Sequence, residues 1–252
     1  MISVETQHLI DHGQGLFETL KIQEGKILNL EAHYERLSKS LMFFNMPPIE
    51  LEAFELEIMK AYHNDHKPVV RLTCLKNKNE NKIILNSRDN PYSFEMYEKG
   101  FCLKKSMVVK KAENILLQHK TTRIEESILE KQELLKEGFQ ESVHFNEKGF
   151  ITEGVYCNLF FVKNKKLYTP HINAGVLPGI LRKNVLKTIK KLGLFCEIGY
   201  YKEEALCFAD EVFMTNAVMG IMPVSKYEQS TYDLSKNDMT RSLMEAYNNG
   251  LL

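Results

Sequence analysis

Short strand-like segments fill most of the second half of the chain, and this pattern most limits the folds that the chain can adopt. Each segment is rich in β-branched and aromatic residues and is bounded by turn residues. The segments are FCLKKSMVV, SVHFN, GFITEG, NLFFVK, KKLYTP, CEIGY, EVFMTN and IMPVSKYE. With so many short strands and few helices among them, the sequence predicts a twisted, partly closed β core with peripheral helices.

The first part of the chain mixes strand and helix patterns. Two strand-like stretches, ETLKIQ and KILNL, flank the turn residues Glu24 and Gly25, and the strand-like VVRLTCL and KIILN follow later. Between these pairs lie two amphipathic stretches, residues 31–42 and 51–62. Apolar residues at spacings of three and four give the second stretch one inward face, formed by Leu51, Phe54, Ile58 and Tyr62.

A polar, irregular stretch, SRDNPYSFEMYEKG, separates the two parts of the chain. Its proline cannot continue a strand ladder, so we expect a domain boundary here, with domains over residues 1–94 and 95–252. In the second domain a helix is expected over residues 124–137, with Ile124, Ile128 and Leu135 on one stripe and Gly138 as its C-terminal stop.

Charge and composition exclude several classes of protein. The sequence has 33 basic and 33 acidic residues, so its neutral balance indicates no electrostatic hold on nucleic acid or on an anionic membrane. No apolar run approaches the roughly 20 residues of a membrane span, and the start lacks the pattern of a secretory signal, so we expect a cytoplasmic protein. Five scattered cysteines without a C-x-x-C pair indicate reduced, mostly buried residues and no metal site.

Several blocks spread along the chain carry a family resemblance. They are DHGQGLFETLKI, HYERL, HKTTRIEES, GFITEGVYCNLFFVKNKKLYTP, AGVLPGILRK and DEVFMTNAVMGIMPV. In this order they resemble the class IV aminotransferase family, the fold type IV pyridoxal-phosphate enzymes. The resemblance implies an α+β fold like that of D-amino-acid aminotransferase, with a small α/β N-terminal domain and a larger β-barrel-like C-terminal domain with helices. It also implies pyridoxal 5'-phosphate as cofactor, a small-molecule amine as substrate, and a homodimer.

Two residues of these blocks match the family's reactive centre. Lys120 matches the lysine that carries the cofactor as a Schiff base, and Glu153 matches the acid that pairs with the pyridine nitrogen. A lysine is suited to the first role because its amine can form an imine, exchange it for the substrate amine and then move a proton. As isolated residues, both would be read as solvated side chains, so the assignment depends on the blocks around them.

Five further residues match the family's phosphate contacts. Gly179 is expected to begin a helix whose first-turn amides, those of Ile180 and Leu181, lack partners within the helix. Arg36 matches the phosphate-binding arginine, although a lone arginine on an amphipathic helix more often forms a surface salt bridge. Asn216 and the amide of Ala217 match a second phosphate loop.

The residue types around these positions leave two enzyme activities open. TNAVMGIMPV and HKTT resemble the aminodeoxychorismate lyases, which form 4-aminobenzoate and pyruvate, more than the branched-chain or D-amino-acid aminotransferases. However, lyases commonly have an Asn-Arg pair where this chain has Arg123 and Ile124. The chain also lacks the T-R-G motif that precedes the carboxylate-binding residues of D-amino-acid aminotransferases, and Lys76 or Arg71 is a candidate replacement. A branched-chain-like aminotransferase is the alternative activity, and a binding protein that has lost catalysis is the rival outside enzymes.

Overall fold

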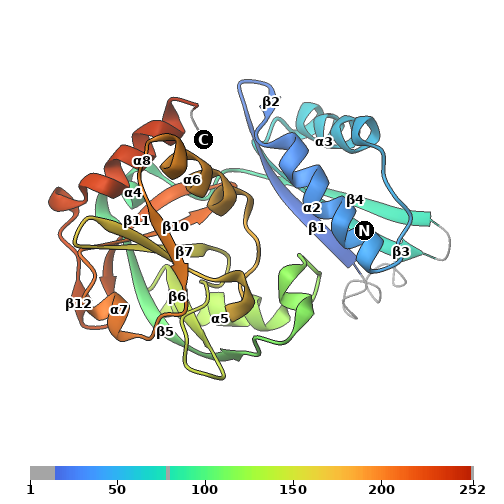
Figure 1. Ribbon diagram of the computed structural model, residues 1–252. Helices are drawn as coiled ribbons and strands as arrows, with labels where there is room; N and C mark the ends of the chain where they lie inside the picture. The colour runs from blue at the N-terminus through green and yellow to red at the C-terminus, as the bar shows by residue number, and fades with distance from the viewer. Residues whose placement is uncertain (1–14, 78–79, 251–252) are drawn as a thin grey trace. The chain divides into compact units, whose positions relative to one another are not determined.

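The computed structural model describes residues 15–77 and 80–250, and the chain divides into two compact units (Figure 1). The first unit contains Met1–Pro91 and His119–Glu125, and the second contains Tyr92–Gln118 and Glu126–Leu252. This division differs from the expected domains, 1–94 and 95–252, chiefly because residues 119–125 return to the first unit. Residues 11–14, which begin the DHGQG block, lie outside the described part of the chain.

The first unit is an antiparallel sheet with two helices on one face (Figure 1). The strand order is β2-β1-β3-β4. In chain order its elements are β1 (Gly15–Gln23), β2 (Lys26–Ile27), α2 (Leu30–Phe43), α3 (Leu51–Asp65), β3 (Val69–Asn77) and β4 (Glu80–Arg88). Positive φ angles at Glu24 and Gly25 form the tight turn between β1 and β2.

Strand periodicity determines which side chains of the first unit enter its core. Leu16, Leu20 and Ile22 of β1 pack with Phe54 and Ile58 of α3 and with other apolar residues of the helices and of β3. Because successive strand residues point to opposite faces, residues at odd positions such as Phe17 project from the face that the two helices do not cover.

The second unit is a larger, curled sheet with strand order β6-β5-β11-β10-β7-β8-β9, and β12 pairs with β11. Its strands are β5 (Phe101–Lys110), β6 (Glu141–Asn146), β7 (Asn158–Lys163), β8 (Lys166–Pro170), β9 (Cys196–Gly199), β10 (Glu211–Asn216), β11 (Gly220–Tyr227) and β12 (Ser230–Thr231). Its helices are α4 (Phe94–Lys99), α5 (Glu125–Lys136), α6 (Ile180–Lys191), α7 (Glu204–Cys207) and α8 (Asp238–Asn248). Short 3-10 turns lie at Ile115–Gln118, Ile172–Ala174 and Leu234–Lys236.

A hydrogen-bonded connection links the two edges of this sheet. The amide of His144 in β6 donates to Glu153 O at 2.8 Å, and the amide of Ile151 donates to Tyr201 O, just beyond β9, at 2.8 Å. Residues 151–153 therefore lie between β6 and the end of β9, in agreement with the expected barrel-like core. The apolar interior includes Phe161 and Met214, while Phe160 and Phe213 pack on the opposite face against α6 and α8.

Several local expectations were wrong. GFITEG forms only an isolated bridge, between Ile151 and Phe145, and a Cβ at Gly154 would lie 2.9 Å from a Glu141 oxygen. Residues 94–99 are helical rather than irregular, and α8 was not anticipated. In α5 the buried residue is Leu134, whereas Ile128 and Leu135 are exposed. Gly138, with a φ of 83°, ends α5 as expected.

All five cysteines are free thiols. Cys74 and Cys157 are buried, Cys102 and Cys196 are half-buried, and Cys207 is exposed. Within residues 15–77 and 80–250, no group of three or more His, Cys, Asp or Glu side chains could hold a metal ion. None of the helices described there has the length and apolar character needed to cross a bilayer.

Candidate active site

The segment that carries Lys120 is held against β1 within the first unit. The amide of Phe17 donates to Lys120 O at 2.9 Å, the amide of Thr122 donates to Gly15 O at 2.9 Å, and Thr121 forms an antiparallel bridge with Leu16. A Cβ at Gly15 would lie 2.6 Å from the Leu75 side chain and 2.9 Å from that of Thr122. Glycine at position 15 is therefore required for this close approach.

The side chain of Lys120 lies on the face of the first sheet that α2 and α3 do not cover. Its Nζ is 4.4 Å from the centroid of the Phe17 ring, and the guanidinium carbon of Arg71 is 3.7 Å from the same centroid. Lys76, in contrast, donates to Phe44 O, at the end of α2, at 3.2 Å. Of the two candidate cations for a substrate carboxylate, Arg71 is thus the one near Lys120.

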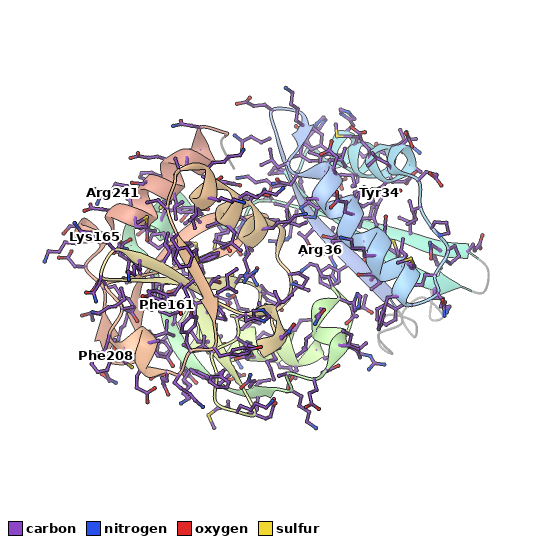
Figure 2. The ribbon with its side chains drawn as sticks, in the orientation of Figure 1. Tyr34, Arg36, Phe161, Lys165, Phe208 and Arg241 are labelled. Carbon is purple, nitrogen blue, oxygen red and sulfur yellow. The ribbon has the colours of Figure 1, made fainter. Side chains whose placement is uncertain are left out.

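Arg36 lies on α2 (Figure 2) and pairs with Glu18 of β1 through two nearly parallel hydrogen bonds. Nε donates to Glu18 Oε1 at 2.7 Å, and Nη2 donates to Glu18 Oε2 at 2.6 Å. His33 Nδ1 lies 2.8 Å from the same Oε2. This bidentate pairing fixes the plane of the guanidinium, so Arg36 is not the exposed salt-bridge residue that its sequence context alone would favour.

The three side chains influence one another's ionisation. Burial alone would raise the pKa of Glu18, but the charge and hydrogen bonds of Arg36, together with His33, outweigh it and hold that pKa at about 2. Burial lowers the pKa of His33, against the opposing effect of Glu18. His33 is therefore neutral near pH 7 and donates its Nδ1 hydrogen to a carboxylate.

The ionisation of Glu18 predicts acid sensitivity. A carboxyl whose pKa falls from 4.5 to about 2 on folding stabilises the fold above its unfolded pKa by roughly 3 kcal/mol. This contribution is lost as the pH falls from about 4.5 towards 2. Glu18→Gln should therefore lower the midpoint of urea unfolding at pH 7 and reduce its dependence on pH below 4.5. Glu55→Gln, at an exposed position of α3, is the control, and equal acid profiles for the two variants would contradict the prediction.

Glu153 lies in the connection between β6 and β7 of the second unit, and two donors meet one of its oxygens. Glu153 Oε2 accepts hydrogen bonds from the amide of Leu177 at 2.9 Å and from Asn158 Nδ2 at 3.2 Å. Two N–H donors on one oxygen stabilise the anionic form and fix its direction. Glu141 supports the turn that follows, because its Oε2 accepts from the amide of Val155 at 2.7 Å.

Asn158 connects Glu153 to the start of α6. Its Nδ2 also donates to Leu177 O at 2.9 Å, and a Cβ at Gly179 would lie 1.8 Å from its Oδ1. No other residue fits at position 179 without displacing Asn158. Gly179 is the N-cap of α6 and, having no side chain, caps none of the amides of the first turn.

The first turn of α6 presents backbone donors, as expected from the sequence. The amides of Ile180 and Leu181 have no acceptor within the helix, and the helix dipole adds partial positive charge at this end. Arg182 in the same turn is buried and donates through Nη2 to Pro170 O at 3.0 Å. Burial lowers the pKa of Arg182, and the charge of Glu153 acts in the opposite direction.

Asn216 and Ala217 lie where β10 turns into β11. Asn216 Oδ1 accepts from the amides of Val218 at 3.0 Å and Met219 at 2.7 Å, so this side chain shapes the turn itself. Its Nδ2 donates to the hydroxyl of Tyr92 at 3.1 Å. Because β10 pairs with β7 so that Thr215 lies opposite Asn158, this turn is adjacent to the Glu153 group.

The structure therefore collects the expected residues into two groups, one in each unit. Lys120 and Arg36 belong to the first group, and the others, Glu153, Ile180, Leu181, Asn216 and Ala217, belong to the second. Sequence reasoning missed Glu18 and Asn158. A signal existed for Glu18, because it occupies a position of β1 where the alternation requires an apolar, inward-facing residue.

Comparisons with known proteins agree with this architecture. The family model for amino-transferase class IV matches residues 15–227. The chain is 27% identical over 256 residues to the aminodeoxychorismate lyase of Bacillus subtilis (94% of this chain, 85% of the relative). It is 28% identical over 235 residues to a probable branched-chain-amino-acid aminotransferase of Thermotoga maritima (92% and 84%). The fold is similar to the crystal structure of a putative 4-amino-4-deoxychorismate lyase of Legionella pneumophila, with a TM-score of 0.87, 22% identity and coverage of 95% and 92%.

The fold and the donor groups define an enzyme that depends on pyridoxal phosphate. The family match spans most of the chain, and the chain belongs to the class IV aminotransferase family. The residues present fit this cofactor. The start of α6 offers backbone donors where any Cβ at Gly179 would intrude, Glu153 is an oriented carboxylate, and Lys120 supplies a primary amine.

Proposed function

We propose that the chain is a 4-amino-4-deoxychorismate lyase, which converts aminodeoxychorismate to 4-aminobenzoate and pyruvate in the synthesis of folate. The observation that carries the proposal is the turn after β10. There the side chain of Asn216 organises the sequence N-A-V-M-G by accepting from two amides, and this is the residue pattern that resembles lyases. The name of the Bacillus subtilis relative supports the same reading.

Each residue of the two groups has a proposed role. When bound, pyridoxal phosphate supplies an aldehyde for amines and a ring that accepts electrons from the bond broken at the substrate carbon. Lys120 Nζ would hold the cofactor covalently and, as a free amine, would take the proton from the amine-bearing carbon of the substrate. Glu153 keeps the pyridine nitrogen protonated through a charge-assisted hydrogen bond.

The phosphate-binding roles follow from charge and backbone geometry. Arg36, whose guanidinium plane is fixed by the hydrogen bonds of Nε and Nη2 to Glu18, would supply positive charge to the phosphate. The amides of Ile180, Leu181 and Ala217 and the side chain of Asn216 supply neutral donors. Arg71, near Lys120 on the open face of the first sheet, is the proposed partner of a substrate carboxylate.

A branched-chain-like aminotransferase is the second candidate. The Thermotoga maritima relative is a probable enzyme of that kind, and Arg123 and Ile124 stand where lyases commonly have an Asn-Arg pair. In this case Lys120 would return the proton to the cofactor carbon and a keto acid would leave.

One pair of assays separates the candidates. Purified protein loaded with pyridoxal phosphate is incubated either with aminodeoxychorismate or with a branched-chain amino acid and 2-oxoglutarate. Formation of 4-aminobenzoate and pyruvate is the expected result. Glutamate formation alone would replace the lyase with the aminotransferase. A protein that binds the cofactor and yields neither product contradicts both activities, and a colourless protein that takes up no cofactor would be the binding protein that has lost catalysis.

The close packing at Gly179 leads to a further prediction. Gly179→Ala should push Asn158 away from Glu153 and Leu177, because the new Cβ would lie 1.8 Å from Asn158 Oδ1 in the present arrangement. We expect affinity for pyridoxal phosphate to fall at least 10-fold and stability by roughly 1–3 kcal/mol. Absorbance titration and urea unfolding measure the two effects. Gly193→Ala, where φ is 70° and no atom lies within 4 Å, should lose stability only, and unchanged cofactor affinity in Gly179→Ala would refute the phosphate role of this turn.

The assembly and location are part of the same proposal. We expect a cytoplasmic homodimer, because the family resemblance implies a dimer and the neutral charge balance indicates no hold on membranes or nucleic acid. Sedimentation equilibrium of the protein loaded with cofactor tests the dimer, and a monomer at micromolar concentration would contradict it.

A further inference from the structure

We propose that His119 is a positioning residue for Lys120, held in place by Ser40, Phe43 and Phe44 at the end of α2. These four residues form what we call the His119 clamp. The inference rests on the proposed covalent role of Lys120 and adds a cause for the direction in which that side chain leaves the backbone. All the contacts involved lie within the first unit.

The hydrogen bond in the clamp has a defined direction. Ser40 Oγ donates to Arg36 O at 3.1 Å and lies 2.9 Å from His119 Nδ1. We assign the single hydroxyl hydrogen of Ser40 to Arg36 O, so that Ser40 accepts from His119 and Nδ1 carries a hydrogen. Burial lowers the pKa of His119, which favours the neutral ring. The serine thus selects one tautomer of a neutral imidazole.

Two aromatic rings fix the plane of that imidazole. Phe43 stacks on it with a centroid distance of 4.3 Å and an interplanar angle of 26°, and Phe44 meets it edge-on at 5.2 Å. Because Phe43, Phe44 and Ser40 all contact the imidazole of His119, this ring has little freedom to rotate about its side-chain torsions. His119 therefore ties its own backbone to α2, the helix that also carries Arg36.

The backbone transmits this constraint to Lys120. Lys120 O accepts from the amide of Phe17 at 2.9 Å, which ties the next peptide to β1. The amide of Thr121 donates to His119 O at 3.0 Å, so a tight turn centred on Lys120 joins His119 to the pairing with β1. With His119 held against α2, this turn directs the side chain of Lys120 to the face that the helices do not cover, where its Nζ lies 4.4 Å from the Phe17 ring centroid. Loosening the clamp would let the amine sample other directions, so fewer encounters with an aldehyde would be productive.

Four variants test the clamp. Ser40→Ala removes the acceptor, and Ser40→Thr restores a hydroxyl. His119→Phe keeps a ring without the Nδ1 donor, and His119→Asn keeps a donor near the position of Nδ1 without the ring. Cofactor-free protein is mixed with increasing pyridoxal phosphate in a stopped-flow instrument. The dependence of the observed rate on pyridoxal phosphate concentration separates the affinity of initial binding from the maximal rate of covalent attachment. Borohydride reduction with peptide mapping identifies the lysine that is attached.

A loss of positioning predicts a specific kinetic pattern. Ser40→Ala and His119→Phe should lower the maximal rate of attachment 10- to 100-fold and change the affinity of initial binding less than 3-fold. Ser40→Thr should lie within 3-fold of the unmodified chain, and His119→Asn between the two extremes. Ala61→Gly is the stability control, because Ala61 is buried in the core of the same unit, outside the clamp.

The outcomes distinguish this inference from the assignment on which it rests. Attachment rates of Ser40→Ala and His119→Phe within 2-fold of the Ala61→Gly rate would overturn the clamp. If the unmodified chain binds pyridoxal phosphate but attaches it to no residue, or to a lysine other than Lys120, the proposed role of Lys120 fails first, and the clamp fails with it.

Discussion

Replacing Lys120 with alanine is expected to abolish covalent attachment of pyridoxal phosphate and to lower turnover by roughly 10⁴-fold or more, because one amine serves both as the tether and as the proton carrier. The cofactor should still bind, since the phosphate and pyridine partners remain. The measurements are the absorption spectrum of the loaded protein, mass spectrometry after borohydride reduction, and kcat in the lyase assay.

The control for this prediction is another lysine of the first unit. Lys21 lies on β1 at an odd position, and burial lowers its pKa. Burial thus disfavours its charged form, and it projects from the same face of the sheet as Phe17. Lys21→Ala should retain attachment and most of the activity. Attachment that persists in Lys120→Ala and disappears in Lys21→Ala would move the reactive centre to position 21.

Replacing Glu153 with glutamine is expected to lower kcat roughly 100-fold, about 3 kcal/mol in activation free energy. Glutamine cannot keep the pyridine nitrogen charged, so the ring would accept electrons less readily. The NH2 group of the glutamine, if it took the place of Oε2, would also face the Leu177 amide and Asn158 Nδ2, which are both donors and now bind Glu153 Oε2. Covalent attachment at Lys120 should persist, and this separates the Glu153 variant from the Lys120 variant.

Glu211→Gln is the matched control for that experiment. Glu211 is also a buried carboxylate of the second unit with three donors, the amides of Met239 and Thr240 and the Thr240 hydroxyl, all at the start of α8. Its replacement should lower stability and leave kcat within about 2-fold, because α8 supplies none of the proposed cofactor contacts. A similar loss of kcat in both variants would mean that Glu153 acts through folding alone.

Much of the second unit could be anticipated from periodicity. Segments such as NLFFVK and EVFMTN combine β-branched and aromatic residues with turn residues at their ends, and they form β7 and β10. The helix after Gly179 was also predicted, and it forms α6. The strand prediction failed at GFITEG, whose last residues lie against Glu141, a residue of β6 that accepts from the amide of Val155.

The partners of charged residues could not be read from the chain. Arg36 on its helix has the appearance of a surface residue, and only the packing of α2 on β1 brings Glu18 within 2.6 Å of it. The same packing places Ser40 next to His119, 79 positions away in the sequence. Such pairs depend on tertiary contacts between distant segments, which no local pattern encodes.

The sequence by itself determined the family and the cofactor and supplied the candidate residues of the reactive centre, because these depend on chemical groups that must occur in a particular order along the chain. Only the tertiary structure decided that residues 119–125 return to the first unit and that Asn158 links Glu153 to the start of α6. The physical reason is that a backbone pairing such as the one between Gly15 and Thr122 uses main-chain groups common to all residues. Which strand finds which partner therefore depends on the packing of the whole unit.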